Sequence, residues 1–402
     1  MPLTVTPTPA PAADAPAPAA RRRAARSCNV IIPHGFEANY VLGFCKGLQA
    51  NGLDLLVVSS DEIEARVRQA GLPQLNLRGS QQENRSVVAK AANFVRYYVQ
   101  LLWLIFRTRG GTHHFVGLLG SRIILLDGVV LPLWLRLWSG RYLHTAHNAL
   151  PHSREHSRFF HHAYRWIYRF PHTILVHTGK VAEQLEHTFG VEPRRIVTIS
   201  IGLNEEVPAA PVDQAEARRR LGVPADARLA LFFGKIERYK GVDLLLQAWD
   251  QVKTPRARLV IAGQCPDSGY AAELQRARAA AAAPESIDWR EGFVPNDAVA
   301  LWLTACDVVV MPYRNIYQSG VVFLCLQFGV PIVATRVGSL AEYVDAGSGI
   351  IADSGDPAAF SRALDAFFAA PDRFDRAQIR ARATRYSWPR QCAGIKHLYN
   401  GY

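Results

Sequence analysis

The sequence has no uninterrupted apolar run of the ~18 residues that a membrane-spanning helix needs. The longest candidates, 98–106 and 123–135, are broken by polar residues, glycine or proline. Cysteine is also scarce: the 402 residues include six, far apart and without a C-x-x-C pair. The first absence excludes a polytopic membrane protein. The second favours reduced core cysteines over a disulfide framework or a zinc site.

Several catalytic signatures are missing as well. The sequence contains no Gly-x-Gly-x-x-Gly fingerprint, no Walker A sequence, no His-Glu-x-x-His and no Gly-x-Ser-x-Gly. The absence of the first argues against a NAD- or FAD-dependent enzyme.

Composition and charge describe a globular protein with one basic region. Apolar residues make up 49% and charged residues 20%, and the length suggests two or three domains of ~100–200 residues each. The net charge is +12, and residues 90–170 hold eleven basic but two acidic residues, together with eight histidines and four tryptophans. This mixture favours an anionic surface or an anionic amphiphile as the partner. Nucleic acid is not expected, because no nucleic-acid motif accompanies the charge.

Apolar strand-like segments alternate with helix-like segments along most of the chain. In the first half, strands are predicted at 28–33, 53–59, 112–118, 142–146 and 173–177, with helices at 39–51 and 91–109. After Gly202 the alternation restarts, with strands at 229–233, 258–262, 286–289, 307–311, 331–334 and 349–352 and helices at 242–252, 270–282, 296–305, 321–328 and 340–345. This order predicts an α/β fold of two doubly wound, Rossmann-like domains facing each other across a cleft.

The first 26 residues have a different composition. They are rich in proline and alanine and end in an arginine cluster, so we expect residues 1–26 to be disordered. The arginine cluster fits either a tether to a membrane surface or a solvated tail.

Two segments of the second half carry candidate phosphate-binding groups. In FFGKIERYKG, a strand ends at Gly234, and Lys235 and Lys240 flank the start of the next helix, where they would neutralise a diphosphate or serve as ordinary surface lysines. In MPYRNIYQSGVV, the pair Ser319-Gly320 begins a helix whose backbone N–H groups would hold a phosphate, unless Ser319 is simply an N-cap.

Two segments of the first half end strands with candidate ligand-facing residues. His147 and Asn148 in HTAHNALPH follow a short strand, and the spacing from His147 to His152 does not suit a helical metal pair, so no metal is expected. In PHGFEANY, Gly35 would let the backbone approach a ligand closely.

Taken together and in this order, these segments resemble the GT-B glycosyltransferases, specifically the bacterial sugar-nucleotide-dependent group with a Glu-x7-Glu-type C-terminal domain. The resemblance covers residues 27–402 and is strongest in FFGKIERYKGVDLLLQAW, EGFVPNDAVALWLTACDVVVMPYRN and QSGVVFLCLQFGVPIVATRVGSLAEYV. It implies an acceptor-binding domain at 27–203, a nucleotide-sugar-binding domain at 204–385, and a last helix at 386–402 that crosses back to the first domain.

The resemblance also implies roles for individual residues. His147, Lys240 and Lys235 match catalytic positions, the lysines holding the donor diphosphate. Donor-binding positions fall on Gly35, Asn148, Gly234, Phe293, Val294, Gln318, Ser319, Gly320 and Val321.

One departure from the family pattern concerns its two glutamates. Their positions fall on Ile316 and Leu324, and Gln318 is the nearest polar substitute. We interpret this as a QSG variant of an active transferase, because both lysines, His147 and the glycines remain.

The resemblance therefore predicts a metal-independent, cofactor-free hexosyltransferase of the retaining type. It would move a sugar from a UDP- or GDP-sugar to a lipid-linked or glycan acceptor in the biosynthesis of exopolysaccharide or cell-surface polysaccharide. The alternative is a non-catalytic GT-B scaffold or binding subunit of a polysaccharide assembly complex. The basic, tryptophan-rich region 90–170 predicts peripheral attachment to the cytoplasmic face of the inner membrane.

Overall fold

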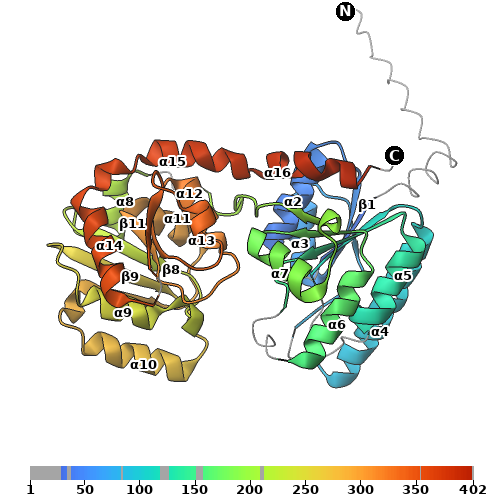
Figure 1. Cartoon of the computed structure of the whole chain (residues 1–402), viewed down its shortest axis with the longest axis horizontal. Coiled ribbons are helices and arrows are strands. Elements are labelled where there is room, and N and C mark those ends of the chain that lie inside the picture. The colour runs from blue at the N-terminus through green and yellow to red at the C-terminus, as the bar shows by residue number, and fades with distance from the viewer. Residues whose placement is uncertain are drawn as a thin grey trace, which may run out of the picture.

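The computed structural model describes residues 29–33, 38–82, 85–117, 126–150, 157–208, 212–353 and 355–400. The predicted disordered tail, Gly35 and His152 lie outside these ranges. Two parallel sheets form the framework, one in each half of the chain (Figure 1). The predicted fold class, two doubly wound α/β domains, is therefore confirmed.

The first sheet has seven parallel strands in the order β3-β2-β1-β4-β5-β6-β7. Its strands are β1 (Asn29–Pro33), β2 (Leu55–Ser59), β3 (Gln74–Asn76), β4 (Thr112–Val116), β5 (Arg141–Ala146), β6 (Thr173–Val176) and β7 (Ile196–Thr198). The order reverses beside β1, so the loops after β1 and β4 leave the same edge in different directions. This is the switch point at which such sheets bind ligands.

Helices cover both faces of this sheet because its strands are apolar on both sides. Val30 and Ile32 face a cluster that includes α4 and α5, whereas Ile31 between them faces a cluster that includes α2, α3 and α16. The helices of this half are α2 (Ala38–Ala50), α3 (Asp61–Gln69), α4 (Val87–Arg107), α5 (Leu131–Trp138), α6 (Arg158–Arg169) and α7 (Gly179–Phe189), with a π-helix η2 (Leu126–Val130) before α5.

The second sheet has six parallel strands in the order β10-β9-β8-β11-β12-β13. They are β8 (Arg228–Phe233), β9 (Ala257–Gly263), β10 (Ile287–Glu291), β11 (Val308–Met311), β12 (Ile332–Thr335) and β13 (Gly349–Ala352). Its helices are α8 (Gln214–Leu221), α9 (Val242–Trp249), α10 (Ser268–Ala279), α11 (Asn296–Ala305), α12 (Gly320–Phe328), α13 (Leu340–Tyr343), α14 (Pro357–Ala369) and α15 (Arg376–Ala383). Every strand predicted in this half is present, with bounds that differ by at most two residues.

The last helix, α16 (Trp388–Ile395), returns to the first domain and packs on α2 (Figure 1). Trp388 is buried there, and its indole N–H donates to the Leu203 carbonyl over 3.0 Å. A side chain at Gly43 or Gly202 would overlap the indole ring, so only glycine allows this close packing. Trp388 thereby joins α2, the connection between the domains and α16.

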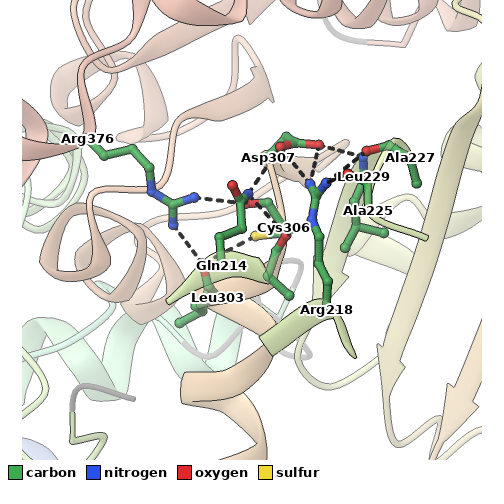
Figure 2. A network of polar contacts seen from close by, with 10 residues as sticks. Gln214, Arg218, Ala225, Ala227, Leu229, Leu303, Cys306, Asp307 and Arg376 are labelled. Atoms are coloured by element: carbon green, nitrogen blue, oxygen red, sulfur yellow. Dashed lines mark hydrogen bonds and ion pairs between the residues drawn. The ribbon is translucent and has the colours of Figure 1, made fainter. Parts of the chain in front are cut away.

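A buried polar network holds α8 on the second sheet (Figure 2). Arg218 donates to both carboxylate oxygens of Asp307, over 2.8 and 2.9 Å, and also to the carbonyl of Ala305. The Asp307 carboxylate in turn accepts from the backbone N–H of Leu229 in β8 over 2.8 Å. Because every group of the pair has a partner, the charges can be tolerated inside the domain.

The two edge strands of the first sheet were not predicted from the sequence. β3 and β7 have three residues each, and half-buried or exposed side chains predominate in them. Such short edge strands lack the apolar run on which a strand prediction depends. Helices α3, α5, α6 and α7 were also not predicted.

Candidate active site

A cleft of about 580 Å³ lies between the two domains, at the carboxyl edges of both sheets. Its walls come from α2 and α3, the end of β5, the connection between the domains, the segments after β8 and β11, and α16. The lining residues are Ala38, Asn39, Tyr40, Arg66, His147, Ile201, Gly202, Leu203, Asn204, Tyr239, Lys240, Ile316, Gln318, Ser319, Gly320, Val321, Leu324 and Trp388.

Lys240 provides a cation on the wall formed by the second domain. It ends a short 3-10 turn after β8, and Gly241 follows in the left-handed region with φ of 66°. A side chain at Gly241 would overlap the Pro312 carbonyl, so this tight turn requires glycine. Burial lowers the pKa of Lys240 to about 8, and Glu237 opposes this shift. The amine is thus held in a partly dehydrated position where a charge change occurs near neutral pH.

The start of α12 lies beside this lysine. A Cβ atom built on Gly234 would lie 3.4 Å from Lys240 Nζ and 3.8 Å from Val321 Cγ2, so the lysine and the first turn of α12 meet at Gly234. Ser319 occupies the N-cap position but makes no capping hydrogen bond with its side chain, which instead bonds to Tyr313. The first backbone N–H groups of α12 are therefore not capped by Ser319, and such a helix start attracts anions.

Gln318 adds a neutral polar group to the same wall. Its Oε1 atom is buried and has no hydrogen-bond partner among the described residues. A buried amide oxygen without a partner is costly, and Gln318 lines the cleft, so its carboxamide is a candidate partner for a donor group of a ligand.

His147 lies on the opposite wall, directly after β5. Its ring lies edge-on to Tyr40, with centroids 4.8 Å apart, and 5.0 Å from the ring of His177. His177 is fixed in turn, because its Nδ1 atom lies 2.9 Å from the Ile199 carbonyl oxygen. The candidate His147 ring is thus held by other aromatic rings at the edge of the cleft.

The cleft brings together six of the predicted site residues: His147, Lys240, Gln318, Ser319, Gly320 and Val321. Gly234 lies against Lys240 but does not line the cleft. Gly35 lies outside the described residues.

Besides Gly234, four predicted residues do not line the cleft. Lys235 is exposed and forms an ion pair with Glu237 over 2.9 Å. Asn148 follows His147, but its carbonyl faces the Tyr168 hydroxyl at 3.4 Å. Phe293 is 83% exposed, and Val294 packs against the core of the second domain. A role for these residues in donor binding stays a prediction.

Ile316 and Leu324, at the positions of the two family glutamates, both line the cleft and are both buried. No Asp or Glu is found among the described lining residues, and the charged side chains there are Lys240 and Arg66. Within the described part of the chain, no group of three metal-ligating side chains is present. The cleft therefore offers cationic, amide and aromatic groups to a ligand.

Tyr40, Arg66 and Trp388 are among the cleft residues that were not predicted from the sequence. Tyr40 stood in the segment singled out for Gly35, and Trp388 in the predicted last helix, but neither was named. Arg66 is paired with Glu206 and donates to Asn39, and it lies on a surface helix without any sequence signal. All three enter the cleft through packing between distant segments.

Two doubly wound parallel sheets, a cleft at their facing edges and a last helix that crosses back define a protein of the GT-B class. The chain belongs to the GT-B glycosyltransferases: residues 37–207 match the family model "Glycosyltransferase Family 4" and residues 227–369 match "Glycosyl transferases group 1". The resemblance inferred from the sequence is thus confirmed.

Individual relatives agree with this assignment. The chain is 31% identical over 237 residues to a D-inositol 3-phosphate glycosyltransferase of Thermobispora bispora, covering 56% of this chain and 55% of the relative. It is 33% identical over 235 residues to the protein of the same name from Geodermatophilus obscurus, covering 56% and 52%. The chain thus spans about half the length of these curated relatives.

Solved structures with the same fold are more distant in sequence. The Anabaena protein HepE in complex with UDP-glucose superposes with a TM-score of 0.71 at 14% identity, covering 91% of this chain and 98% of that one. Sucrose-phosphate synthase from Thermosynechococcus elongatus gives a TM-score of 0.70 at 17% identity, covering 93% and 98%. At this identity the likeness shows the fold alone.

Proposed function

We propose that the protein transfers a hexosyl group from a nucleotide-sugar to an acceptor hydroxyl in the cleft. The observation that carries this proposal is the pairing of Lys240 with the uncapped start of α12 on one wall. Together they form a binding place for a diphosphate. His147 lies on the opposite wall, where a sugar attached to that diphosphate would lie.

The donor is a nucleotide-sugar, with UDP- and GDP-sugars as the candidates. The fold neighbour HepE was solved with UDP-glucose, which supports the UDP series. For the acceptor we propose a lipid-linked or glycan hydroxyl in the assembly of a cell-surface polysaccharide. Because the relatives are named D-inositol 3-phosphate glycosyltransferases, a phosphorylated inositol belongs in any acceptor panel.

The chemistry needs no protein nucleophile. The bond between sugar C1 and the diphosphate oxygen breaks, C1 bonds to the acceptor oxygen on the same face, and the leaving phosphate takes the acceptor proton. Lys240 and the N–H groups of α12 stabilise the charge that develops on the leaving diphosphate, as preorganised donors do in other enzymes. We propose that no metal is required, since these groups occupy the role a divalent cation would have.

Lys240→Ala tests this assignment. We expect turnover to fall about 10²- to 10³-fold, because one preorganised donor to a developing oxyanion is lost. The measurement is transfer or hydrolysis with a panel of UDP-, GDP- and ADP-sugars. Lys253→Ala, which removes a lysine outside the cleft, is the matched control. Unchanged turnover in Lys240→Ala would sink the assignment.

A second candidate function is a non-catalytic scaffold. It is favoured by one observation: Ile316 and Leu324 place apolar side chains in the cleft where the family has glutamates. Calorimetry with nucleoside diphosphates separates the two candidates, because a scaffold without a donor site has no measurable affinity for any of them.

We also propose that the protein works as a peripheral protein on the cytoplasmic face of the inner membrane. No helix in the described part of the chain is long and apolar enough to cross a bilayer. Large apolar side chains are nevertheless exposed on α4, α5 and α6. The same region of the sequence is rich in arginine and has few acidic residues. A surface of this composition suits an anionic membrane, where each basic residue contributes about 1 kcal/mol of binding. We expect salt to weaken this attachment.

A further inference from the structure

Helix α4 is apolar on two opposite sides. One side is buried in the first domain through Tyr97, Tyr98, Leu101 and Ile105. The other side carries exposed residues, at steps of four, three, four and four along the helix: Val88, Ala92, Val95, Val99 and Trp103. Residues at this spacing share one face of a helix. We call these five residues the α4 stripe.

The stripe is too exposed to be part of the domain core. Val88 is 79% exposed, Val99 62% and Trp103 57%. A surface helix normally turns polar residues to solvent, and a helix that is apolar all round is normally buried. Five exposed apolar residues in one row are therefore typical of a surface that binds another molecule or a membrane.

Neighbouring elements extend this apolar surface. α5 packs against α4 and exposes Leu133 and Leu137, which are four residues apart. The π-helix η2 exposes Val129 and Val130 and contacts both α5 and α6. α4, α5 and α6 cover the same face of the first sheet, and α4 and α5 lie at the end of the molecule away from the second domain (Figure 1). No described residue of these helices lines the cleft, so a partner bound to this surface would not block it.

The charge beside the stripe has one sign. From Arg85 to Gly117 the sequence contains no Asp or Glu, and Arg96 and Arg107 lie at exposed positions of the same helix. Elsewhere in the first domain, near Trp166 of α6, a cavity of about 590 Å³ is lined by Arg165, Arg169 and Arg195, and no acidic residue is among its described lining residues. An apolar strip bordered by cations is complementary to an anionic lipid surface, with acyl chains below and phosphates above.

We propose that the α4 stripe, together with Leu133 and Leu137, inserts into the headgroup region of an anionic bilayer. Trp103 lies at the headgroup level, where indole rings are favoured. This inference rests on the proposed membrane attachment and specifies its surface. In this orientation α4 lies along the plane of the membrane. The inserted apolar side chains then add to the attraction between the basic residues and the anionic lipids.

Flotation with vesicles of phosphatidylglycerol and phosphatidylcholine tests the surface. Val99→Gln and, separately, Trp103→Gln alter exposed side chains, so folding is retained and is checked by circular dichroism. We expect each to weaken vesicle binding roughly tenfold, the loss of one inserted apolar side chain. Leu75→Gln is the matched control: Leu75 is 40% exposed on β3 of the same domain, outside the stripe. It should bind as the unmodified protein does.

The outcomes separate this inference from the proposals on which it rests. If the unmodified protein floats and all three variants float equally well, the stripe is not the docking surface, although the attachment stands. If the unmodified protein does not float at low ionic strength, both the attachment and the stripe are wrong, while hydrolysis of a nucleotide-sugar in solution still tests the transferase. If Val99→Gln converts a dimer into a monomer in sedimentation and leaves flotation unchanged, the stripe binds a second copy and the inference is overturned.

Discussion

At the scale of single residues, the cleft depends on side chains whose surroundings alter their chemistry. Lys240 is a clear case, because burial lowers its pKa to about 8 while Lys235 remains exposed beside Glu237. The two lysines look equivalent in the sequence. The structure gives only Lys240 a position in the cleft.

The first prediction concerns the pH dependence of transfer. In the proposed reaction only the ammonium form of Lys240 stabilises the leaving diphosphate, so kcat/KM should fall above pH ~8, approaching tenfold per pH unit, as the free enzyme loses this proton. Lys240→Arg keeps its charge at all these pH values, since arginine has a pKa above ~12. Its kcat/KM should therefore show no decline between pH 8 and 10. A decline that persists unchanged in Lys240→Arg would show that another group titrates.

At the scale of secondary-structure elements, the second domain is held together by polar contacts as well as by its apolar core. Arg218 connects α8 to Asp307 before β11, and Asp307 connects to Leu229 of β8. Arg376 at the start of α15 donates to the carbonyls of Leu303 and Cys306, next to the Arg218–Asp307 pair (Figure 2). The network fixes the segment between α11 and β11, from which the cleft loop after β11 continues.

The second prediction tests this network. Arg218→Met leaves the Asp307 carboxylate without its main partner inside the domain, so we expect a loss of about 3–5 kcal/mol in the free energy of unfolding. Urea unfolding followed by circular dichroism measures it. Arg219→Met is the control: this neighbour on α8 is exposed and pairs with Glu216, so its loss should cost less than about 1 kcal/mol. Equal effects of the two substitutions would contradict a structural role for the network.

At the scale of the whole molecule, two features join the domains near the cleft. Trp388 brings α16 onto α2 and the connection between the domains, and the Tyr343 hydroxyl donates to the His177 carbonyl over 3.1 Å. His177 supports the ring of His147. The catalytic candidate on the first domain is thus linked to a residue of the second.

Because of its buried histidines, the stability of the first domain should depend on pH. Desolvation lowers the pKa of His113 to about 4 and of His144 to about 3, and that of His114 well below its usual value. In the unfolded chain these rings titrate near ~6.5, so between that pH and about 3 the unfolded state binds more protons. Their contribution to stability is complete above pH ~6.5 and is lost as the pH falls through this range.

The third prediction follows for thermal unfolding. Tm should decline steadily below pH 6.5, and His144→Phe should reduce the slope, because one buried titrating ring is removed from a position stacked on Phe115. His187→Gln removes an exposed histidine and is the control, for which the slope should not change. A flat Tm between pH 6.5 and 4 in the unmodified protein would contradict the buried neutral state of these histidines.

The sequence by itself determined the fold class and the family. Apolar segments at strand length alternate with helices in both halves, and this order is compatible with parallel sheets and little else. It also located the segments around Gly234, His147 and Ser319, because loops that follow parallel strands meet at one edge of the sheet. Local spacing carries this information, so no tertiary contact was needed to read it.

The tertiary structure alone decided which side chains share the cleft and which surface of α4 is exposed. Tyr40, Arg66 and Trp388 come from three different helices, whereas Lys235 and Phe293 lie outside the cleft despite their positions in matching segments. Periodicity showed that α4 is broadly apolar, but not that Val99 and Trp103 remain uncovered. Burial is a property of contacts between segments far apart in the chain, and local sequence does not contain it.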